Sequence, residues 1–468
     1  MRHPFIARRG RRLAAVVAAA STGLAGLVLA AAPAPAGAPQ AKAQDLRQEA
    51  YDAGRAAYVL GYPLVTMRRT QAIRTCRAAV NTMVHRATLA TPANRDVVTP
   101  NNDTVYSQAW LDLRPGPQRL SLPPASAERY FSFQFLDMYT EVFDVAHGAA
   151  EGRSDVYVVG PDWHGVAPEG VRVVRSPTPD VWMIGRTFVN GPDDLAAAGA
   201  FQQQYTLTGP AGTQPLPPGT DCTTLPRPQT VHEAGAGFFD ELEAALAANP
   251  PTKDERKQLK ALSKLGDGHG DLPGADSDPA IVAGLEAAVI DGQAEIAQRA
   301  ENAEFKADGW RWEMGIGTWG TDYLRRAAIT LIGLGALPAE EAIYYWGFTD
   351  ASGADLTGAS TYLLHLPAGS LPPVEEGGFW SITMYDGVSR FLVDNPIDRY
   401  AINNATPGVV RNDDGSLDIH LQHDAPAGHE SNWLPAPEGK FYVVLRLYLP
   451  QQSALDGTWT PPALIVGS

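Results

Sequence analysis

Short runs of alternating apolar and polar residues, separated by prolines and glycines, constrain the fold of this chain more than any other feature. Alternation with a period of two turns successive side chains to opposite faces of a strand. Runs this short favour antiparallel strands over parallel strands joined by crossover helices. They are TVYSQAWLDL, RYFSFQFLDMYTEVFDV, DVYVVG, VRVVRS and VWMIGRTFV within residues 99–189, and TYLLHLP, FWSITMYD, LDIHLQHD and KFYVVLRLYLP from about residue 361 onward. Each region is expected to form a pair of packed sheets.

The chain between these two regions has helical periodicity. Apolar residues recur at three- and four-residue spacing in GFFDELEAALAANPP, DERKQLKALSKLG and DPAIVAGLEAAVIDGQAEIAQRAEN, as in amphipathic helices. A leading helix is expected over residues 45–77, interrupted at Pro63. The sequence therefore predicts a mainly β fold with α-helices (α+β): two antiparallel β-sandwich or jelly-roll-like domains joined by a helical middle segment.

Changes in pattern and composition set the predicted domain boundaries. At 468 residues the chain is long enough for several hydrophobic cores. The predicted parts are an export signal (1–43), an N-terminal sandwich with its leading helix (44–210), a Pro/Gly-rich connector (211–230), a helical segment (231–345) and a C-terminal sandwich (346–468).

The first residues have the features of an export signal. They combine a basic start, an apolar run and the small-residue sequence AKA at residues 41–43. Arg8 and Arg9 suit a twin-arginine route, and basic starts serve the general route equally. An uncut apolar run would be long enough to span a membrane, but its alanines and prolines favour cleavage. We expect a secreted or cell-envelope (periplasmic) protein without a stable membrane span after signal removal.

The charge of the chain disfavours polyanionic partners. Removing residues 1–43 takes away six basic residues and no acidic ones, so the formal charge changes from −15 to −21. Phosphate backbones and anionic lipid surfaces repel such a chain. Nucleic acid is therefore not an expected partner.

Two cysteines, Cys76 and Cys222, are available for a disulfide. An oxidising compartment would allow the bond to persist, and closing so long a loop would stabilise the fold by about 4 kcal/mol in the chain-entropy model. Two unpaired buried thiols are the alternative, because the sequence does not give the distance between the two Cα atoms.

A dense polar run, Asn101-Asn102-Asp103-Thr104, leads directly into the strand that contains Tyr106. Asn and Asp commonly begin turns by binding their own backbone, which explains the run without any functional role. The alternative is a site at the rim of the strand, since Tyr106 lies on the strand face opposite the one expected in the core.

A second candidate region lies near the C-terminus. NWLPAP contains two alternate prolines, which stiffen the path that presents Asn432 and Trp433. In the strand that follows, Arg446 lies between aromatic neighbours, where it can hold a carboxylate, stack on a ring or pair with a structural acid.

Two segments of the chain resemble one another. YFSFQFLD (130–137) and FWSITMYD (379–386) share two aromatic residues, a serine, an apolar, a polar and another apolar residue, then any residue and an aspartate. Eight positions fit either a true repeat of two sandwiches or two unrelated half-buried strands. We call these segments the paired motifs.

Local signatures of catalysis or metal binding are absent from the sequence. It has no GxSxG elbow, HExxH pair, phosphate-binding glycine loop or dinucleotide fingerprint. His420 and His423 lie at an odd offset, which turns two strand side chains to opposite faces and argues against chelation. No metal and no cofactor are expected.

Four segments together resemble a bacterial two-part family. PNNDTVYSQAWLDL, YLRRAAITLIGLGA, FWSITMYDGVSRFLVDNP and NWLPAPEGKFYVVLRLYLP are similar, in order, to segments of proteins that join domain of unknown function 1254 to domain of unknown function 1214. The resemblance covers nearly all of the chain after the signal. It implies an exported, β-rich protein with a helical middle and carries no catalytic residue, because the family's activity is not established.

Two functions fit these observations. The first is a non-catalytic exported protein that binds a small molecule or glycan in an aromatic groove, and the second is an exported hydrolase-type enzyme with acid/base residues near the Asn-Asn-Asp-Thr corner. Self-association is plausible for a sandwich protein, but no feature specifies it. The candidate ligand-binding residues are Asn101, Asn102, Thr104, Tyr106, Tyr385, Asn432, Trp433 and Arg446, and the candidate acid/base residues are Asp103 and Asp386.

Overall fold

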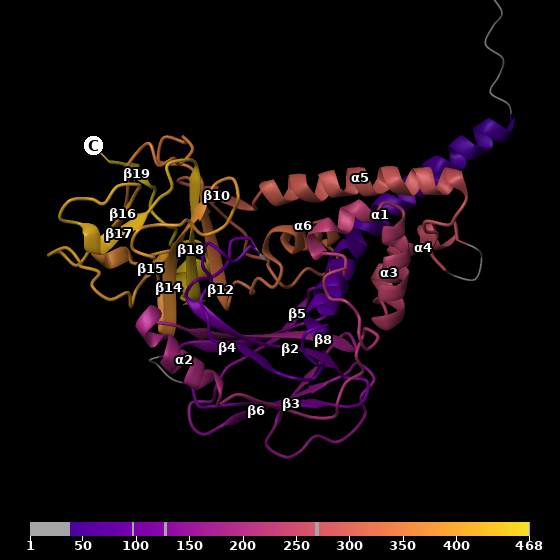
Figure 1. Ribbon diagram of the computed structural model, residues 1–468, viewed down its shortest axis with the longest axis horizontal. Coiled ribbons are helices and arrows are strands. Elements are labelled where there is room, and N and C mark those ends of the chain that lie inside the picture. The colour runs from indigo at the N-terminus through magenta and orange to yellow at the C-terminus, as the bar shows by residue number, and fades with distance from the viewer. Residues whose placement is uncertain (1–37, 96–97, 126–128, 267–270, 468) are drawn as a thin grey trace, which may run out of the picture. The chain divides into compact units, whose positions relative to one another are not determined.

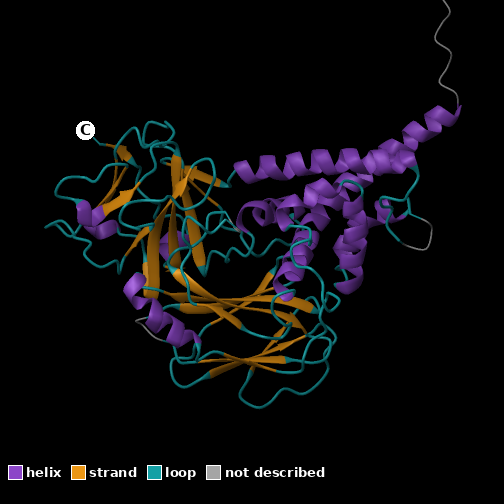
Figure 2. Cartoon of the chain, in the orientation of Figure 1, coloured by secondary structure: helices purple, strands orange, loops and turns teal. Residues whose placement is uncertain are grey.

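A computed structural model describes residues 38–95, 98–125, 129–266 and 271–467. Residues 44–468 form one compact unit in which antiparallel sheets and helices combine (Figures 1 and 2), so the predicted α+β fold is confirmed. The predicted export signal lies outside the described residues except for residues 38–43, which begin helix α1. Within the described part of the chain, no helix has both the length and the apolar character needed to cross a membrane.

The N-terminal sandwich consists of two sheets with a shared apolar interior. In the described chain its larger sheet has the order β1-β2-β8-β4-β5 and its smaller sheet the order β7-β6-β3-β9, and all neighbours are antiparallel except β6 and β7. Leu111, Phe133 and Met183 of the larger sheet pack against Leu120 and Val158 of the smaller one. The strands are β1 (Val84–Arg86), β2 (Thr104–Asp112), β3 (Gln118–Leu122), β4 (Phe131–Leu136), β5 (Val142–Ala146), β6 (Ser154–Val159), β7 (Arg172–Arg175), β8 (Asp180–Phe188) and β9 (Thr206–Thr208).

The C-terminal sandwich has the same two-sheet construction. Among the residues described, the larger sheet has the order β10-β11-β12-β18-β14-β15 and the smaller sheet the order β17-β16-β13-β19, with β16 and β17 parallel. The strands are β10 (Phe305–Ala307), β11 (Trp310–Trp312), β12 (Ala342–Gly347), β13 (Tyr362–Leu366), β14 (Val374–Asp386), β15 (Ala401–Asn403), β16 (Leu417–Gln422), β17 (Trp433–Pro435), β18 (Phe441–Pro450) and β19 (Ile465–Val466).

Strands of this second sandwich begin earlier than the sequence pattern indicates. β10, β11 and β12 all precede residue 361, and β12 crosses the predicted boundary between residues 345 and 346. They are missed because three-residue strands and the run AIYYWG are too short to show a period of two. The domain boundaries stay predictions.

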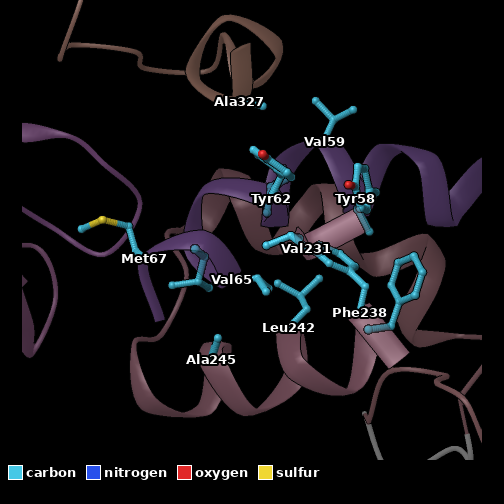
Figure 3. Close-up of a cluster of buried hydrophobic side chains, with 14 of the residues drawn as sticks. Tyr58, Val59, Tyr62, Val65, Met67, Val231, Phe238, Leu242, Ala245 and Ala327 are labelled. Carbon is cyan, nitrogen blue, oxygen red and sulfur yellow. The ribbon is translucent and has the colours of Figure 1, made fainter. Parts of the chain in front are cut away.

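Helices α1, α3, α4, α5 and α6 pack together and against the larger N-terminal sheet. Buried side chains of α1, such as Tyr58 and Val65, meet Val231, Phe238 and Leu242 (Figure 3). The helices are α1 (Ala38–Thr75), α2 (Leu195–Gln202), α3 (Gly237–Ala248), α4 (Lys253–Ser263), α5 (Pro279–Glu301), α6 (Tyr323–Gly333) and α7 (Gln452–Leu455).

Helix α1 continues through Pro63, so the predicted interruption there is wrong. A proline inside a helix costs about 3 kcal/mol because it removes a hydrogen bond and crowds the preceding turn. The residues around it, from Tyr58 to Met67, are almost all buried. This packing offsets the local cost, which the sequence pattern alone does not reveal.

Cys76 and Cys222 form a disulfide across 146 residues of sequence. Cys76 directly follows α1, and Cys222 lies in the Pro/Gly-rich connector. The bond therefore fixes the connector to the end of α1.

We predict that replacing both Cys76 and Cys222 by serine lowers the free energy of unfolding by about 4 kcal/mol, because the denatured chain regains the freedom that the closed loop removes. Urea denaturation of the oxidised wild type and the variant measures the difference. Equal unfolding midpoints, with thiol labelling showing an intact bond in the wild type, would contradict the prediction.

Candidate functional site

The paired motifs occupy equivalent positions in two similar halves of the structure. We call the larger N-terminal sheet with its entering chain the first half, and the larger C-terminal sheet the second half. Four strands follow the same antiparallel order in both, β2-β8-β4-β5 and β12-β18-β14-β15. In each half an arginine of the middle strand pairs with a tyrosine on one neighbour and a motif serine on the other. The sets are Arg186 with Tyr106 and Ser132, and Arg446 with Tyr344 and Ser381.

Arg446 is buried and binds groups from both halves. Its guanidinium donates to Thr383 Oγ1 at 3.0 Å and to the Tyr385 hydroxyl at 2.9 Å, both on its own sheet. It also donates to the backbone carbonyl of Thr99 at 3.3 Å. Thr99 belongs to residues 99–103, which lead into β2 of the first half and which we call the first entry segment.

Arg186 makes the corresponding contacts in the first half. Its guanidinium donates to Gln134 Oε1 at 2.9 Å, and Gln134 holds the same place in its motif as Thr383 does in the other. The guanidinium also donates to the backbone carbonyl of Gly335 at 2.7 Å. Gly335 begins residues 335–341, which lead into β12 of the second half and which we call the second entry segment. Each arginine therefore holds the chain that enters the opposite half.

We call the contacts of each entry segment with the opposite half the exchange. The polar run of the first entry segment adds further contacts to it. Asn101 Oδ1 accepts from the backbone N–H groups of Asp103 at 2.6 Å and Thr104 at 2.9 Å, which is the turn expected from the sequence. Asn101 Nδ2 donates to the hydroxyl of Tyr448 in the second half at 2.6 Å. Asn102 Nδ2 donates to the carbonyl of Ala90 at 2.6 Å. The run thus begins the strand and also joins the halves.

Asp103 carries a carboxyl group into the second half. Its Oδ1 accepts from Asn403 Nδ2 at 3.3 Å, and Asn403 pairs with Ser381 across the sheet. Burial raises the pKa of Asp103, while Ser381, Arg446 and Asn403 act in the opposite direction. Asp103 Oδ2 and Ser381 Oγ make no hydrogen bond of normal geometry with the described residues. The carboxyl group is therefore close to the serine but not firmly paired with it.

Glu341 carries the corresponding carboxyl group into the first half. It directly precedes β12, as Asp103 directly precedes β2. The hydroxyl of Tyr130 donates to Glu341 Oε1, and His147 Nε2 lies 2.9 Å from Glu341 Oε2. Burial, together with the charge of Glu341, raises the pKa of Tyr130 far above its ordinary value. Tyr130 therefore stays a hydroxyl donor at any physiological pH.

Aromatic rings fill the space where the two halves meet. Tyr130 and Phe188 come from the first half, and Phe379 and Tyr448 from the second. The Phe379 ring centroid lies 4.3 Å from that of Phe188 and 4.3 Å from that of Tyr448. Burying these rings supplies an apolar driving force beside the polar contacts.

The structure brings only part of the predicted site together. Asn101, Asp103, Tyr385 and Arg446 meet in the exchange just described, with Asn102 and Thr104 next to them in the chain. Tyr106 takes part through Arg186, whose guanidinium carbon lies 5.9 Å from its ring centroid. These residues are mostly buried between the halves, and they do not form the open aromatic rim that the sequence suggested.

The other three predicted residues bind local backbone in the C-terminal sandwich. Asp386 Oδ1 accepts from the N–H groups of residues 388 and 389 at 3.2 and 2.6 Å. Asn432 binds the N–H and carbonyl of Val410 at 2.8 and 2.7 Å. The indole N–H of Trp433 donates to the carbonyl of Gln422 at 2.8 Å. Each side chain holds a turn or a strand end.

Arg186, Ser132, His147 and Glu341 were missed from the sequence. The eight-residue alignment of the paired motifs already matches Ser132 with Ser381. No sequence signal places Glu341 or His147 there, because both act across strands far apart in the chain.

Both paired motifs end in an aspartate that begins a turn. Asp137 Oδ1 accepts from the N–H groups of Tyr139 at 2.8 Å and Glu141 at 2.9 Å, as Asp386 does in its own turn. Asp137 is buried, and burial raises its pKa to about 7, although its two backbone hydrogen bonds oppose the rise. This carboxyl group therefore titrates near neutral pH.

An open groove lies between α3 and α4, away from the predicted residues. Its volume is about 640 Å³. The apolar part of its lining comprises Leu246, Ala247, Leu259 and Leu272, and its polar part comprises Glu243, Lys253, Arg256, Lys257, Lys260 and Ser263. We call it the basic groove. In the described part of the chain, no group of three or more His, Cys, Asp or Glu side chains is arranged to hold a metal ion.

Comparisons with known proteins agree with the resemblance noted from the sequence. The family described as "Protein of unknown function (DUF1254)" matches residues 80–209, and "Protein of unknown function (DUF1214)" matches residues 341–452. No curated protein matches the chain.

A solved structure shows the same fold. The VPA0106 protein from Vibrio parahaemolyticus is similar at a TM-score of 0.66 and 21% identity, over 90% of this chain and 100% of that one. An uncharacterized protein from Burkholderia cenocepacia gives a TM-score of 0.43 and 12% identity, over 90% of this chain and 95% of that one.

We predict that Arg446→Met and Arg186→Met each lower the free energy of unfolding by roughly 3 kcal/mol or more. The guanidinium is lost while buried acceptors remain unpaired. Chemical denaturation checks this, with the exposed Arg77→Met as control, for which a change within about 0.5 kcal/mol is expected. Similar small changes in all three variants would refute the role of the arginines.

We also predict that Asp137→Asn changes the pH dependence of stability. A folded pKa of about 7, above the unfolded value of about 4, means that the wild type loses stability as the pH rises between these values. The variant keeps the acceptor oxygen and lacks the titration, so it is expected to be more stable at pH 8 by on the order of a few kcal/mol. Parallel pH profiles for the two proteins would count against this assignment.

Proposed function

The chain belongs to the family that joins domain of unknown function 1254 to domain of unknown function 1214, and we propose that it is an exported, non-catalytic protein that binds an amphipathic anion. The observation that carries the proposal is the basic groove, which combines an apolar lining with four basic side chains. A volume of about 640 Å³ lies within the range of small-molecule sites, roughly 300–1,000 Å³. The predicted export signal and the disulfide support the exported location.

The periodicity of α4 explains why its cations gather at the groove. Lys253, Lys257 and Lys260 are spaced by four and three residues, so they lie along one face of the helix. Leu259 of the same helix also lines the groove and is buried. Glu255 reaches back to Thr252 in a capping box and pairs with Arg326, so it faces away from these lysines. The rim therefore carries four basic side chains, of which Lys257 also pairs with Asp254 at 3.6 Å.

The lining selects for a ligand with two parts. Leu246, Ala247 and Leu272 favour an apolar chain, because covering them removes apolar surface from water. The α4 cations favour a carboxylate or phosphate head group. Glu243 lines the opposite side, where burial and the neighbouring Asp271 raise its pKa. A long-chain carboxylate satisfies both requirements.

The geometry favours binding over hydrolysis. Asp103 is 2% exposed and lies between the halves, and Asp386 is used to hold a turn. Neither acid lines the basic groove. Two of the predicted aromatic side chains are also occupied, since the Tyr385 hydroxyl donates to the Pro100 carbonyl at 2.7 Å and the Trp433 indole donates to the Gln422 carbonyl.

We predict that dodecanoate binds the oxidised protein after signal removal, and that uncharged dodecanol binds more weakly. Isothermal titration calorimetry measures both. Lys257→Glu with Lys260→Glu is expected to weaken dodecanoate binding by roughly tenfold or more, because two attractive charges become repulsive. Lys306→Glu, an exposed change on β10, is the matched control and is expected to leave affinity unchanged.

A second variant tests the location. Ala247→Trp places a large ring in the groove from an exposed position, so it is expected to block binding without loss of stability. Absence of dodecanoate binding to the wild type, or equal affinity in Ala247→Trp, would overturn the proposal.

A further inference from the structure

The two acidic side chains that cross between the halves meet different partners. Asn403 ends β15 and pairs with Ser381, while His147 directly follows β5, one residue beyond the Ala146–Phe133 pair and thus beside Ser132. The two residues occupy equivalent positions. Asn403 donates a neutral amide to Asp103, and His147 presents an imidazole to Glu341. Of these two partners, only His147 of the first half has a side chain of a type that titrates near neutral pH.

The surroundings of His147 favour a proton on both ring nitrogens. Nε2 lies 2.9 Å from Glu341 Oε2, and Nδ1 lies 3.2 Å from the carbonyl oxygen of Phe131. Both neighbours are acceptors, so only the doubly protonated ring satisfies both. A neutral ring would point a lone pair at an oxygen atom. The side chain is 37% exposed, so solvent can exchange this proton without unfolding the protein.

We propose that His147 and Glu341 form a proton-controlled joint between the halves: the imidazolium holds the second entry segment on the first sheet, and loss of its proton loosens that segment. The hydroxyl of Tyr130 donates to the same carboxylate, and its oxygen lies 2.7 Å from Ser132 Oγ. The joint therefore connects the surface to the buried polar contacts of the first half.

Other charges near the ring do not reverse this behaviour. Burial alone lowers the pKa of His147, but the hydrogen bond and charge of Glu341, with the Phe131 carbonyl, raise it above the ordinary value. Arg172 of β7 opposes protonation, and its charge is partly neutralised by Asp144 at 2.6 Å. The joint is thus fully formed below the unfolded pKa of about 6.5. It is lost as the pH rises through the higher folded pKa.

The second entry segment is placed to pass on this change. It joins α6 to β12, and it is held by the Gly335 carbonyl on Arg186 and by the Ala336 carbonyl, which accepts from Gln134 Nε2 at 2.8 Å. Glu341 is the anchor at its far end. Releasing that anchor loosens the end of the segment next to β12, while the Arg186 and Gln134 contacts and the Asp103–Asn403 contact remain.

The direct test is the pKa of His147 in the otherwise native protein, measured by NMR with ¹³C-labelled histidine. The His147→Asn spectrum assigns the signal. We expect the wild-type value above about 6.5, and a lower value in Glu341→Gln, which keeps the shape and removes the charge. A wild-type pKa at or below about 6.5, or no change in Glu341→Gln, would overturn the proposal.

Hydrogen exchange measures the release itself. Amides of residues 335–342 are expected to lose protection above the His147 pKa in the wild type, after correction for the intrinsic rate. His147→Asn, which copies the equivalent residue of the second half, is expected to keep its protection unchanged over the same range. The difference between the two proteins excludes the titration of Asp137, which both share. Equal losses in both proteins would contradict the joint.

Discussion

Two buried guanidinium groups, each bound to the chain that enters the other half, hold this structure together. Arg446 binds the Thr99 carbonyl and Arg186 binds the Gly335 carbonyl. Burying a charged group is costly unless its hydrogen bonds are satisfied. In each half, one of the hydrogen bonds of the arginine goes to a backbone carbonyl of the chain that enters the other half. Neither half is complete without the other, which explains why residues 44–468 form one compact unit despite containing two sandwiches.

The same exchange explains the chemistry of the polar run before β2. Asn101 turns the chain, binds Tyr448 of the second half and brings Asp103 beside Ser381 and Arg446. Short polar side chains suit this run because Asp103 and Thr104 are buried. Their backbone N–H groups therefore require partners, and Asn101 Oδ1 supplies them. The run therefore resembles a binding site in sequence while its partners are supplied by the protein itself. The basic groove lies on other elements, so assembly and proposed ligand binding use separate parts of the fold.

The sequence predicts the fold class because its main signals are local. Alternation in strands such as β2 and β18, and helical spacing in α5, depend on neighbouring residues alone. The paired motifs also mark true structural equivalents, since Ser132 and Ser381 face matching arginines. The partners of those arginines could not be predicted, because contacts such as Arg446 with Thr99 span 347 residues. Asp386 and Trp433 looked like site residues because turn formation and ligand binding use the same residue types.

The central claim is that side chains of one half are energetically coupled to the entry segment of the other. A double-mutant cycle on Asn101→Ala and Tyr448→Phe measures this coupling across the 2.6 Å contact most directly. The exchange predicts a coupling free energy of about 1 kcal/mol or more, since either change alone already removes the bond. Additive effects, within about 0.3 kcal/mol, would show that the two halves do not depend on each other at this contact.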